Sequence, residues 1–249
     1  MIRAMIFDLD GTLVKTERLK AISYAQAAIE LCPAEITESK ALEAFKQVVG
    51  LSRKEVAQQL LTQFHLEQPA AQYMHEFGVT TPWQAFLQIR LRHYEKMIND
   101  PQVIKDNQWP YTMALLQQAR LMHCRIGLAT MSSCHQVRNI LEVLSLTGVF
   151  DFVATINDIS HPKPDPEIYF LVRDEFHVRS EECLVIEDSP VGVEAALNAG
   201  MHVVAVATPF TQHLLHLSNL LAPALIVDRP EDLIHQVTTL VAEINKDEL

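Results

Sequence analysis

Short, uninterrupted apolar runs recur along the chain with amphipathic segments between them, and this alternation limits the fold more than any other feature. Strands are expected over Ala4 to Phe7, Ile126 to Ala129, Phe152 to Ala154, Leu184 to Ile186, Val203 to Val206 and Leu225 to Val227. Runs of this kind are typical of strands covered on both faces of a parallel sheet. Helical patterns occupy Trp109 to Met122, Ser133 to Leu144, Pro166 to Phe176, Pro190 to Asn198 and Pro230 to Ile244. The sequence therefore predicts an α/β, doubly wound fold with a mostly parallel, Rossmann-like sheet.

One long region breaks this alternation. Between about Lys15 and Asp106 no convincing strand is found, and good helix formers dominate. Apolar residues recur there at helical spacing, as in Leu19, Ile22, Ala25, Ala28 and Ile29. We therefore expect a core domain formed by residues 1–14 and 107–249, and an inserted, all-helical cap domain over residues 15–106. An insertion after the first strand would lie above the carboxyl end of that strand as a lid; the alternative is an unrelated helical domain.

Two carboxylates follow the first expected strand, in the segment Ile6-Phe7-Asp8-Leu9-Asp10-Gly11-Thr12-Leu13-Val14. Alternate side chains of an extended strand share a face, so Asp8 and Asp10 should point at one site. Like charges this close repel unless a cation lies between them or one holds a proton. Their oxygens suit magnesium, and one carboxylate could be a nucleophile beside a general acid/base. The alternative is a polar turn at Asp10-Gly11.

A second strand ends in hydroxyls, in Gly127-Leu128-Ala129-Thr130-Met131-Ser132-Ser133. A helix that begins here would offer free N–H groups and hydroxyls to a phosphate, although Ser and Thr are also ordinary helix caps. A third segment, His161-Pro162-Lys163-Pro164-Asp165-Pro166, places a lysine among three prolines. The prolines delay the next helix until after Pro164 or Pro166 and fix Lys163, which could then screen a phosphate and an aspartate together. A solvated loop lysine is the alternative.

A fourth segment ends another apolar strand with Glu187 and Asp188, followed by Ser189. These acids could complete a magnesium shell begun by Asp8 and Asp10. The alternative is helix capping by Asp188 or Ser189.

In this order and spacing, the DxDGTL, KPxP and EDS segments resemble the haloacid dehalogenase superfamily over essentially the whole chain. The resemblance implies that Asp8 attacks phosphorus and forms an aspartyl-phosphate. Asp10 would protonate the leaving oxygen and then activate the hydrolytic water. Thr130 would hydrogen-bond the phosphoryl group, and Lys163 would hold Asp8 and the phosphate. Members that remove halide from carbon lack the second carboxylate, so Asp10 favours phosphate chemistry.

The same resemblance implies a Mg²⁺ site. Its ligands would be Asp8, the backbone carbonyl of Asp10 and Asp188, with Glu187 nearby or acting through water. The physical purpose of such a site is to neutralise charge during phosphoryl transfer.

The helical insertion resembles the cap of the subfamily that contains β-phosphoglucomutase and sugar-phosphate phosphatases. The segment from Val49 to Glu55 is similar to a cap loop that carries a phosphate-binding arginine, which would be Arg53; the alternative is a surface arginine at a helix start. Lys20 stands where many relatives have a histidine tied to mutase behaviour, and Lys15 stands where many have an acidic residue. The expected substrate-binding residues are Gly11, Thr12, Lys20, Arg53, Met131 and Ser132. Met131 replaces a smaller or polar residue, so it could narrow the pocket or pack beneath the cap.

The function predicted from these segments is a magnesium-dependent phosphatase for a small phosphorylated metabolite, such as a sugar phosphate. One alternative is a phosphomutase of the β-phosphoglucomutase type, which returns the phosphoryl group to a sugar. Another is a phosphonate hydrolase that uses a Schiff base on Lys15, Lys20 or Lys54. A non-catalytic binding protein on the same fold is the fourth possibility.

The composition limits which binding partners and which cell compartment we expect. The formal net charge of −11 disfavours nucleic acid and anionic membranes as partners. The four cysteines form no CxxC pair, and no signal peptide or membrane-spanning stretch is recognised, so we expect a cytoplasmic protein. A monomer is the default expectation. Residues 246–249 spell the retention signal KDEL, which we interpret as a charged helix end because such a signal acts only in the secretory pathway.

Overall fold

The protein, described as a computed structural model over residues 1–49 and 51–246, separates into two compact units. The first is formed by Met1–Lys15 and Ile104–Leu249, and the second by Thr16–Val103. The second unit therefore interrupts the first after its first strand.

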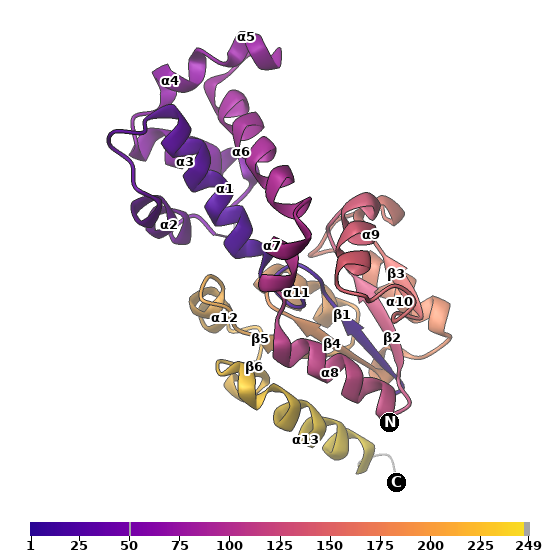
Figure 1. Ribbon diagram of the computed structural model, residues 1–249. Helices are drawn as coiled ribbons and strands as arrows, with labels where there is room; N and C mark the ends of the chain where they lie inside the picture. The colour runs from indigo at the N-terminus through magenta and orange to yellow at the C-terminus, as the bar shows by residue number, and fades with distance from the viewer. Residues whose placement is uncertain (50, 247–249) are drawn as a thin grey trace. The chain divides into compact units, whose positions relative to one another are not determined.

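The first unit contains a six-stranded sheet in the order β3-β2-β1-β4-β5-β6, with every neighbouring pair parallel. The strands are β1 (Ala4–Phe7), β2 (Arg125–Ala129), β3 (Phe152–Ala154), β4 (Cys183–Glu187), β5 (His202–Val206) and β6 (Ile226–Val227). This confirms the predicted doubly wound α/β fold. The chain adds β2 and β3 on one side of β1 and then returns to add β4 on the other side, so β1 is central (Figure 1).

The helices of this unit cover both faces of the sheet. They are α8 (Pro110–Leu121), α9 (Cys134–Val143), α10 (Glu167–Phe176), α11 (Pro190–Asn198), α12 (Gln212–Ser218) and α13 (Leu233–Lys246). Residues of α10 and α11 share one buried apolar cluster with Ala4 and Ile6 of β1. Because alternate residues of a strand face opposite ways, Met5 and Phe7 are buried on the other face. On that side α8 and α13 pack against each other (Figure 1).

The element boundaries differ from the predicted ones at two places near prolines. Leu225 was expected in the last strand but ends a 3₁₀ turn, Pro223–Leu225. The last helix was expected from Pro230, but Pro230–Asp232 forms a separate 3₁₀ turn before α13. In both places a proline fixes the local φ angle and removes a hydrogen-bond donor, which favours a short turn before the regular element.

Among the described residues of the second unit, every regular element is a helix, as the sequence predicted. It contains α1 (Thr16–Leu31), α2 (Glu38–Lys46), α3 (Arg53–Gln63), α4 (Glu67–Ala71), α5 (Met74–Phe77) and α6 (Pro82–Ile98); α7 (Pro101–Asp106) spans its end. Its core includes Tyr24, whose ring lies 5.4 Å from Phe45 and 6.0 Å from Phe86. The buried guanidinium of Arg90 lies 5.0 Å from the Tyr24 ring and 4.6 Å from the Tyr94 ring. An aromatic core with a buried cation therefore stabilises this unit.

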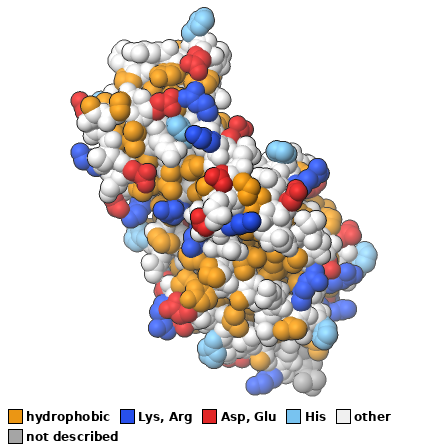
Figure 2. Space-filling view, in the orientation of Figure 1, with side chains coloured by type: hydrophobic (Ala, Val, Ile, Leu, Met, Phe, Trp, Pro, Cys, Tyr) orange, Lys and Arg blue, Asp and Glu red, His pale blue; other side chains and the backbone are white. Residues whose placement is uncertain are grey.

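The surface and the chain end add two observations. On the face shown in Figure 2, basic side chains are interspersed with acidic ones. Within the described part of the chain, every helix is too short or too polar to cross a membrane. Helix α13 ends at Lys246, and the remaining three residues of the KDEL segment lie outside the described residues, as does Gly50 of the predicted cap loop.

Candidate active site

The register of three central strands brings the predicted motifs to one edge of the sheet. Phe7 of β1 pairs with Leu128 of β2 and with Ile186 of β4. At the next residue of the chain, the Asp8 N–H donates to the Ile186 carbonyl at 3.0 Å. Since all strands are parallel, their carboxyl ends meet there. The side chains that follow β1, β2 and β4 therefore share one site although they are far apart in sequence.

A buried acidic cluster lies at this edge. Asp8, Glu187 and Asp188 each offer a carboxylate oxygen, and these oxygens all lie within 4.8 Å of one another. The three residues are 5%, 1% and 2% exposed, respectively. Buried carboxylates at this spacing repel one another strongly unless positive charge lies among them.

Lys163 supplies positive charge to the cluster. Its ammonium group donates to Asp8 Oδ1 at 2.9 Å, to Glu187 Oε1 at 2.6 Å and to the Ala129 carbonyl at 3.0 Å. The side chain is 4% exposed, so it is not a solvated loop lysine. Burial alone would lower its pKa, but Asp8 and Glu187 hold the pKa of Lys163 well above its usual value. The group is therefore a fixed cation.

One lysine does not balance the carboxylates around Asp8. Burial raises the pKa of Asp8 to about 8; Lys163 opposes this shift, while Glu187 and Asp10 add to it. Asp8 would thus hold a proton at neutral pH unless more positive charge were present. Clustered carboxylate oxygens are the ligands that hard divalent cations prefer. The donor set and the charge deficit together fit a magnesium ion.

Two glycines leave room for these acids. Gly11 has φ +91°, and a Cβ there would lie 2.1 Å from Asp188 Oδ2. A Cβ on Gly192, in the first turn of α11, would lie 1.8 Å from Glu187 Oε1. Neither distance is possible for real atoms, so any side chain at either position would displace a carboxylate. Gly11 was predicted as a substrate-binding residue; its observed contribution is to admit Asp188.

Hydroxyl groups that follow β2 hold the second aspartate. Ser132 Oγ makes a short hydrogen bond to Asp10 Oδ2, and Thr130 Oγ1 donates to the same oxygen at 3.4 Å. The Ser132 N–H donates to Thr130 Oγ1 at 3.1 Å. Ser133 then begins α9 as its N-cap, in a capping box with Gln136. The second motif therefore orients Asp10, and phosphoryl binding by Thr130 stays a prediction.

Glu187 is held from both sides, by three residues of the predicted motifs and by Tyr169, which the sequence did not indicate. Its Oε1 accepts from Lys163 and, at 2.9 Å, from the Tyr169 hydroxyl. Its Oε2 accepts from the Asp188 N–H at 3.0 Å and from the Ser189 hydroxyl at 3.2 Å. Tyr169 is completely buried on α10. Only helical periodicity marks Tyr169 in the sequence, and periodicity predicts burial without predicting this contact.

The remaining predicted site residues divide between the two units. The buried Thr12 hydroxyl donates to Asp188 Oδ1 at 3.5 Å, and Met131 is partly buried just after Thr130. Lys20 lies on α1 and Arg53 begins α3, both in the second unit. Their expected contacts with substrate stay predictions.

Two of the lysines considered for a Schiff base contact aromatic rings. The Lys15 ammonium lies 4.5 Å from the centre of the Trp109 ring, and the Lys54 ammonium lies 5.9 Å from that of Trp83. Each ammonium group therefore has an aromatic partner within its own unit, and the phosphonate hydrolase stays an alternative.

The sheet order and the buried acid–lysine site define an α/β protein with paired aspartates after its central strand. The model of the haloacid dehalogenase-like hydrolase family matches residues 5–206. The chain belongs to this family, which confirms the resemblance found in its motifs. It is accordingly an enzyme of the hydrolase class.

Similar proteins extend over most of the chain. A phosphorylated carbohydrates phosphatase of Thermotoga maritima is 28% identical over 80% of this chain and 82% of its own length. The β-phosphoglucomutase of Bacillus subtilis is 26% identical over 82% of this chain and 83% of its own. A haloacid dehalogenase-like protein of unknown function from Agrobacterium tumefaciens has the same fold, with a TM-score of 0.74 and 18% identity, covering 97% of this chain and 100% of that one.

Proposed function

We propose that the protein is a magnesium-dependent phosphatase that hydrolyses a small phosphorylated metabolite, such as a sugar phosphate, through an aspartyl-phosphate on Asp8. The observation that carries this proposal is the Lys163 ammonium group, which binds Asp8 and Glu187 inside a buried acidic cluster. A nucleophilic carboxylate beside a fixed cation is the arrangement that phosphoryl transfer requires. The name of the Thermotoga relative supports a phosphorylated carbohydrate as the substrate class.

The proposed reaction has two steps. A carboxylate oxygen of Asp8 attacks phosphorus and the bond to the leaving oxygen breaks, while Asp10 gives that oxygen its proton. Asp10 then takes a proton from a water molecule, whose oxygen attacks phosphorus and releases the Asp8 carboxylate. Lys163 holds Asp8 throughout, and Ser132 and Thr130 orient Asp10.

Magnesium would be held by Asp8, Asp188 and the backbone carbonyl of Asp10, with Glu187 beside them. When bound, it would supply positive charge that offsets the carboxylates and the phosphoryl oxygens. The raised pKa of Asp8 supports this need, because Asp8 must be ionised to act as a nucleophile.

The inserted unit is proposed to act as the cap that selects the substrate, with Lys20 and Arg53 binding its distal part. Arg53 is exposed and occupies the first position of α3. Positive charge is unfavourable at a helix N-terminus, so helix stability does not explain this arginine. An anionic group of the substrate would explain it.

The test is phosphate release from a panel of phosphorylated metabolites, with magnesium and with EDTA, by the wild type and Asp8→Asn. We expect magnesium-dependent release that falls at least about 10³-fold in Asp8→Asn, because the nucleophile is lost. Activity that survives EDTA would contradict the metal assignment. No release from any compound by the wild type would contradict the phosphatase.

A phosphomutase is the second candidate, and the Bacillus relative named β-phosphoglucomutase is the observation that favours it. Lys20 in place of the mutase histidine favours hydrolysis instead. The panel therefore includes β-glucose 1-phosphate with detection of glucose 6-phosphate. Isomerisation without phosphate release would establish the mutase. A cytoplasmic monomer remains our expectation for the assembly and its location.

A further inference from the structure

The loop that carries Lys163 has few backbone N–H groups with which to form stabilising hydrogen bonds. Of the seven residues from Ser160 to Pro166, three are prolines, so four backbone N–H groups remain. The loop is mostly exposed on its outer side, yet it must deliver the Lys163 ammonium to a buried position between Asp8 and Glu187. Hydrogen bonds outside the buried cluster also hold the loop, including one from the Asn198 side-chain amide to the Pro164 carbonyl at 3.3 Å.

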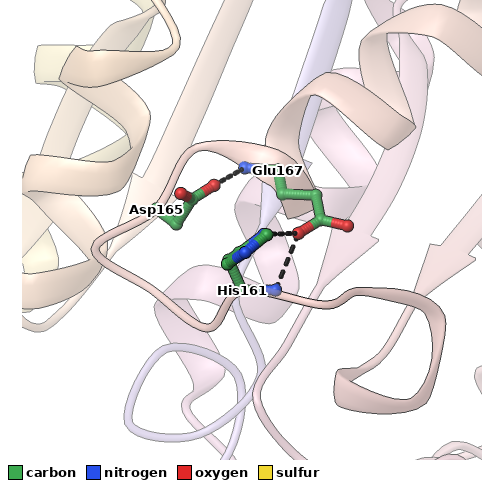
Figure 3. A group of neighbouring side chains, drawn as sticks. All are labelled: His161, Asp165 and Glu167. Carbon is green, nitrogen blue, oxygen red and sulfur yellow. Dashed lines mark hydrogen bonds and ion pairs between the residues drawn. The ribbon is translucent and has the colours of Figure 1, made fainter.

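Glu167, the first residue of α10, reaches back to the start of this loop (Figure 3). Its Oε1 accepts from the Ser160 N–H at 2.9 Å, and its Oε2 accepts from the His161 N–H at 2.7 Å. The His161 ring Nδ1 lies 3.0 Å from the same Oε2. One carboxylate thus uses two of the four N–H groups that the prolines leave.

Asp165 completes the arrangement from the other end of the loop. Its Oδ1 accepts from the Glu167 N–H at 2.9 Å, and its own N–H donates to the Pro162 carbonyl at 3.0 Å. The segment 160–167 is therefore closed on itself, with Lys163 at its middle. Backbone hydrogen bonds from Ser160 and His161 lower the pKa of Glu167, so its carboxylate is charged at neutral pH.

We propose that Glu167 is a positioning residue for the reaction, because its carboxylate closes the proline-rich loop that holds Lys163 against Asp8. The inference rests on the proposed phosphatase function but assigns a residue that the motifs do not. His161, Asp165 and Glu167 also lie close enough together to hold a metal ion. Their hydrogen bonds, however, show the Glu167 oxygens engaged with the loop backbone, and we assign no metal to them.

The reaction is sensitive to the position of Lys163, since a displacement of about 1 Å in a reacting group can cost about 10²-fold in rate. The Glu167 carboxylate hydrogen-bonds Ser160 and His161 and belongs to a different group of side chains from the acidic cluster, so its removal would act through the loop. The side chain is 34% exposed, and its loss should leave the apolar core intact.

The experiment compares wild type, Glu167→Ala, Glu167→Gln and the control Glu175→Ala, which removes an exposed acid from the same helix. Three quantities are measured: kcat and KM, the melting temperature, and labelling of each lysine by acetic anhydride, read by mass spectrometry. Lys105, exposed in the same unit, is the reference for labelling.

We expect kcat of Glu167→Ala to fall about 10- to 100-fold, with a smaller change in KM and with Lys163 labelled several-fold faster relative to Lys105. Glu167→Gln retains one acceptor oxygen and should lie between Glu167→Ala and wild type, and Glu175→Ala should equal wild type. A merely structural role would lower the melting temperature without speeding Lys163 labelling at a temperature where the variant is folded. If the alanine variant does not fold, the glutamine variant is read in the same way.

Wild-type labelling of Lys163 in both Glu167 variants would overturn the inference, even if activity fell, since Lys163 would not have moved. Unchanged kcat would overturn it as well. If the wild type itself released no phosphate, the proposed function would fail, and the labelling of Lys163 would still decide whether Glu167 positions it.

Discussion

The sheet unit and the helical insertion hold their proposed functional residues in different ways. In the sheet unit, Asp8, Glu187 and Asp188 lie at the carboxyl ends of parallel strands and are buried, and Lys163 binds two of them, Asp8 and Glu187. In the insertion, Arg53 is exposed in the first turn of a helix and Lys20 is partly buried on another. The reacting groups are thus fixed by strand register and packing. The residues proposed to select the substrate lie at exposed or partly buried positions, where a substitution changes little of the packing.

The largest effect that would sharpen this comparison is expected from Gly192→Ala. The new methyl group would occupy the position of Glu187 Oε1 and displace the carboxylate that holds Lys163. We expect kcat/KM to fall about 10²-fold, together with a lower melting temperature. Steady-state kinetics and thermal unfolding measure both.

The matched control is Gly148→Ala. Gly148, unlike Gly192, has a positive φ, +75°, and a Cβ there meets nothing within 4 Å. It should cost about 1 kcal/mol of stability through backbone strain and leave kcat unchanged. If Gly192→Ala behaved like Gly148→Ala, the close packing around Glu187 would not matter for the reaction.

For a substitution in the insertion we expect a smaller effect, on KM rather than on kcat. Arg53→Ala should raise KM about tenfold and change kcat little, because a contact with the distal part of the substrate is made equally in ground state and transition state. Lys40→Ala, an exposed cation on α2, is the control and should have no effect. A fall in kcat at constant KM would show that Arg53 acts on the reacting phosphoryl group. The division into reacting groups in the sheet unit and substrate-selecting residues in the insertion would then be wrong.

The smallest expected effect is a pH dependence of stability in the sheet unit without metal. Burial raises the pKa of Asp8 to about 8, so the folded protein holds this proton more tightly than the unfolded chain does. The stabilisation is complete below the ordinary aspartate pKa of about 3.9 and is lost as the pH rises to about 8. In EDTA the melting temperature should therefore fall by several degrees between about pH 5 and about pH 8.

Two comparisons check the origin of that slope. Asp8→Asn has no proton to lose at this position and should show a flatter dependence. The proposed magnesium ion would bind the ionised carboxylates, so its addition should raise the melting temperature most near pH 8. An equal slope in wild type and Asp8→Asn would assign the pH dependence to other groups.

Much of the fold could be predicted because it depends on patterns within single segments. Continuous apolar runs predicted the strands, and helical periodicity predicted α1. The meeting of Asp8 with Glu187 and Asp188 could also be predicted, since parallel strands bring their carboxyl ends together. Lys163 was expected beside Asp8, and its ammonium group lies there.

What could not be predicted depends on contacts between side chains from different segments. The Tyr169 hydroxyl on Glu187, the Ser132 hydroxyl on Asp10 and the room left by Gly192 follow from how α10, the β2 end and α11 pack. No periodicity in the sequence carries that information. The expected substrate contacts of Lys20 and Arg53 likewise depend on a partner molecule, which a single chain does not specify.

The two connections to the inserted unit leave the sheet unit at neighbouring points. The Lys15 N–H donates to the Asn107 carbonyl at 2.7 Å, and the Trp109 N–H donates to the Leu13 carbonyl at 2.8 Å. A chain that leaves and returns at one hydrogen-bonded junction can carry an insertion of any size without altering the sheet. The inserted unit is therefore an exchangeable module: evolution could replace it, and an engineer could graft another in its place, while the reacting groups stay where β1, β2 and β4 hold them.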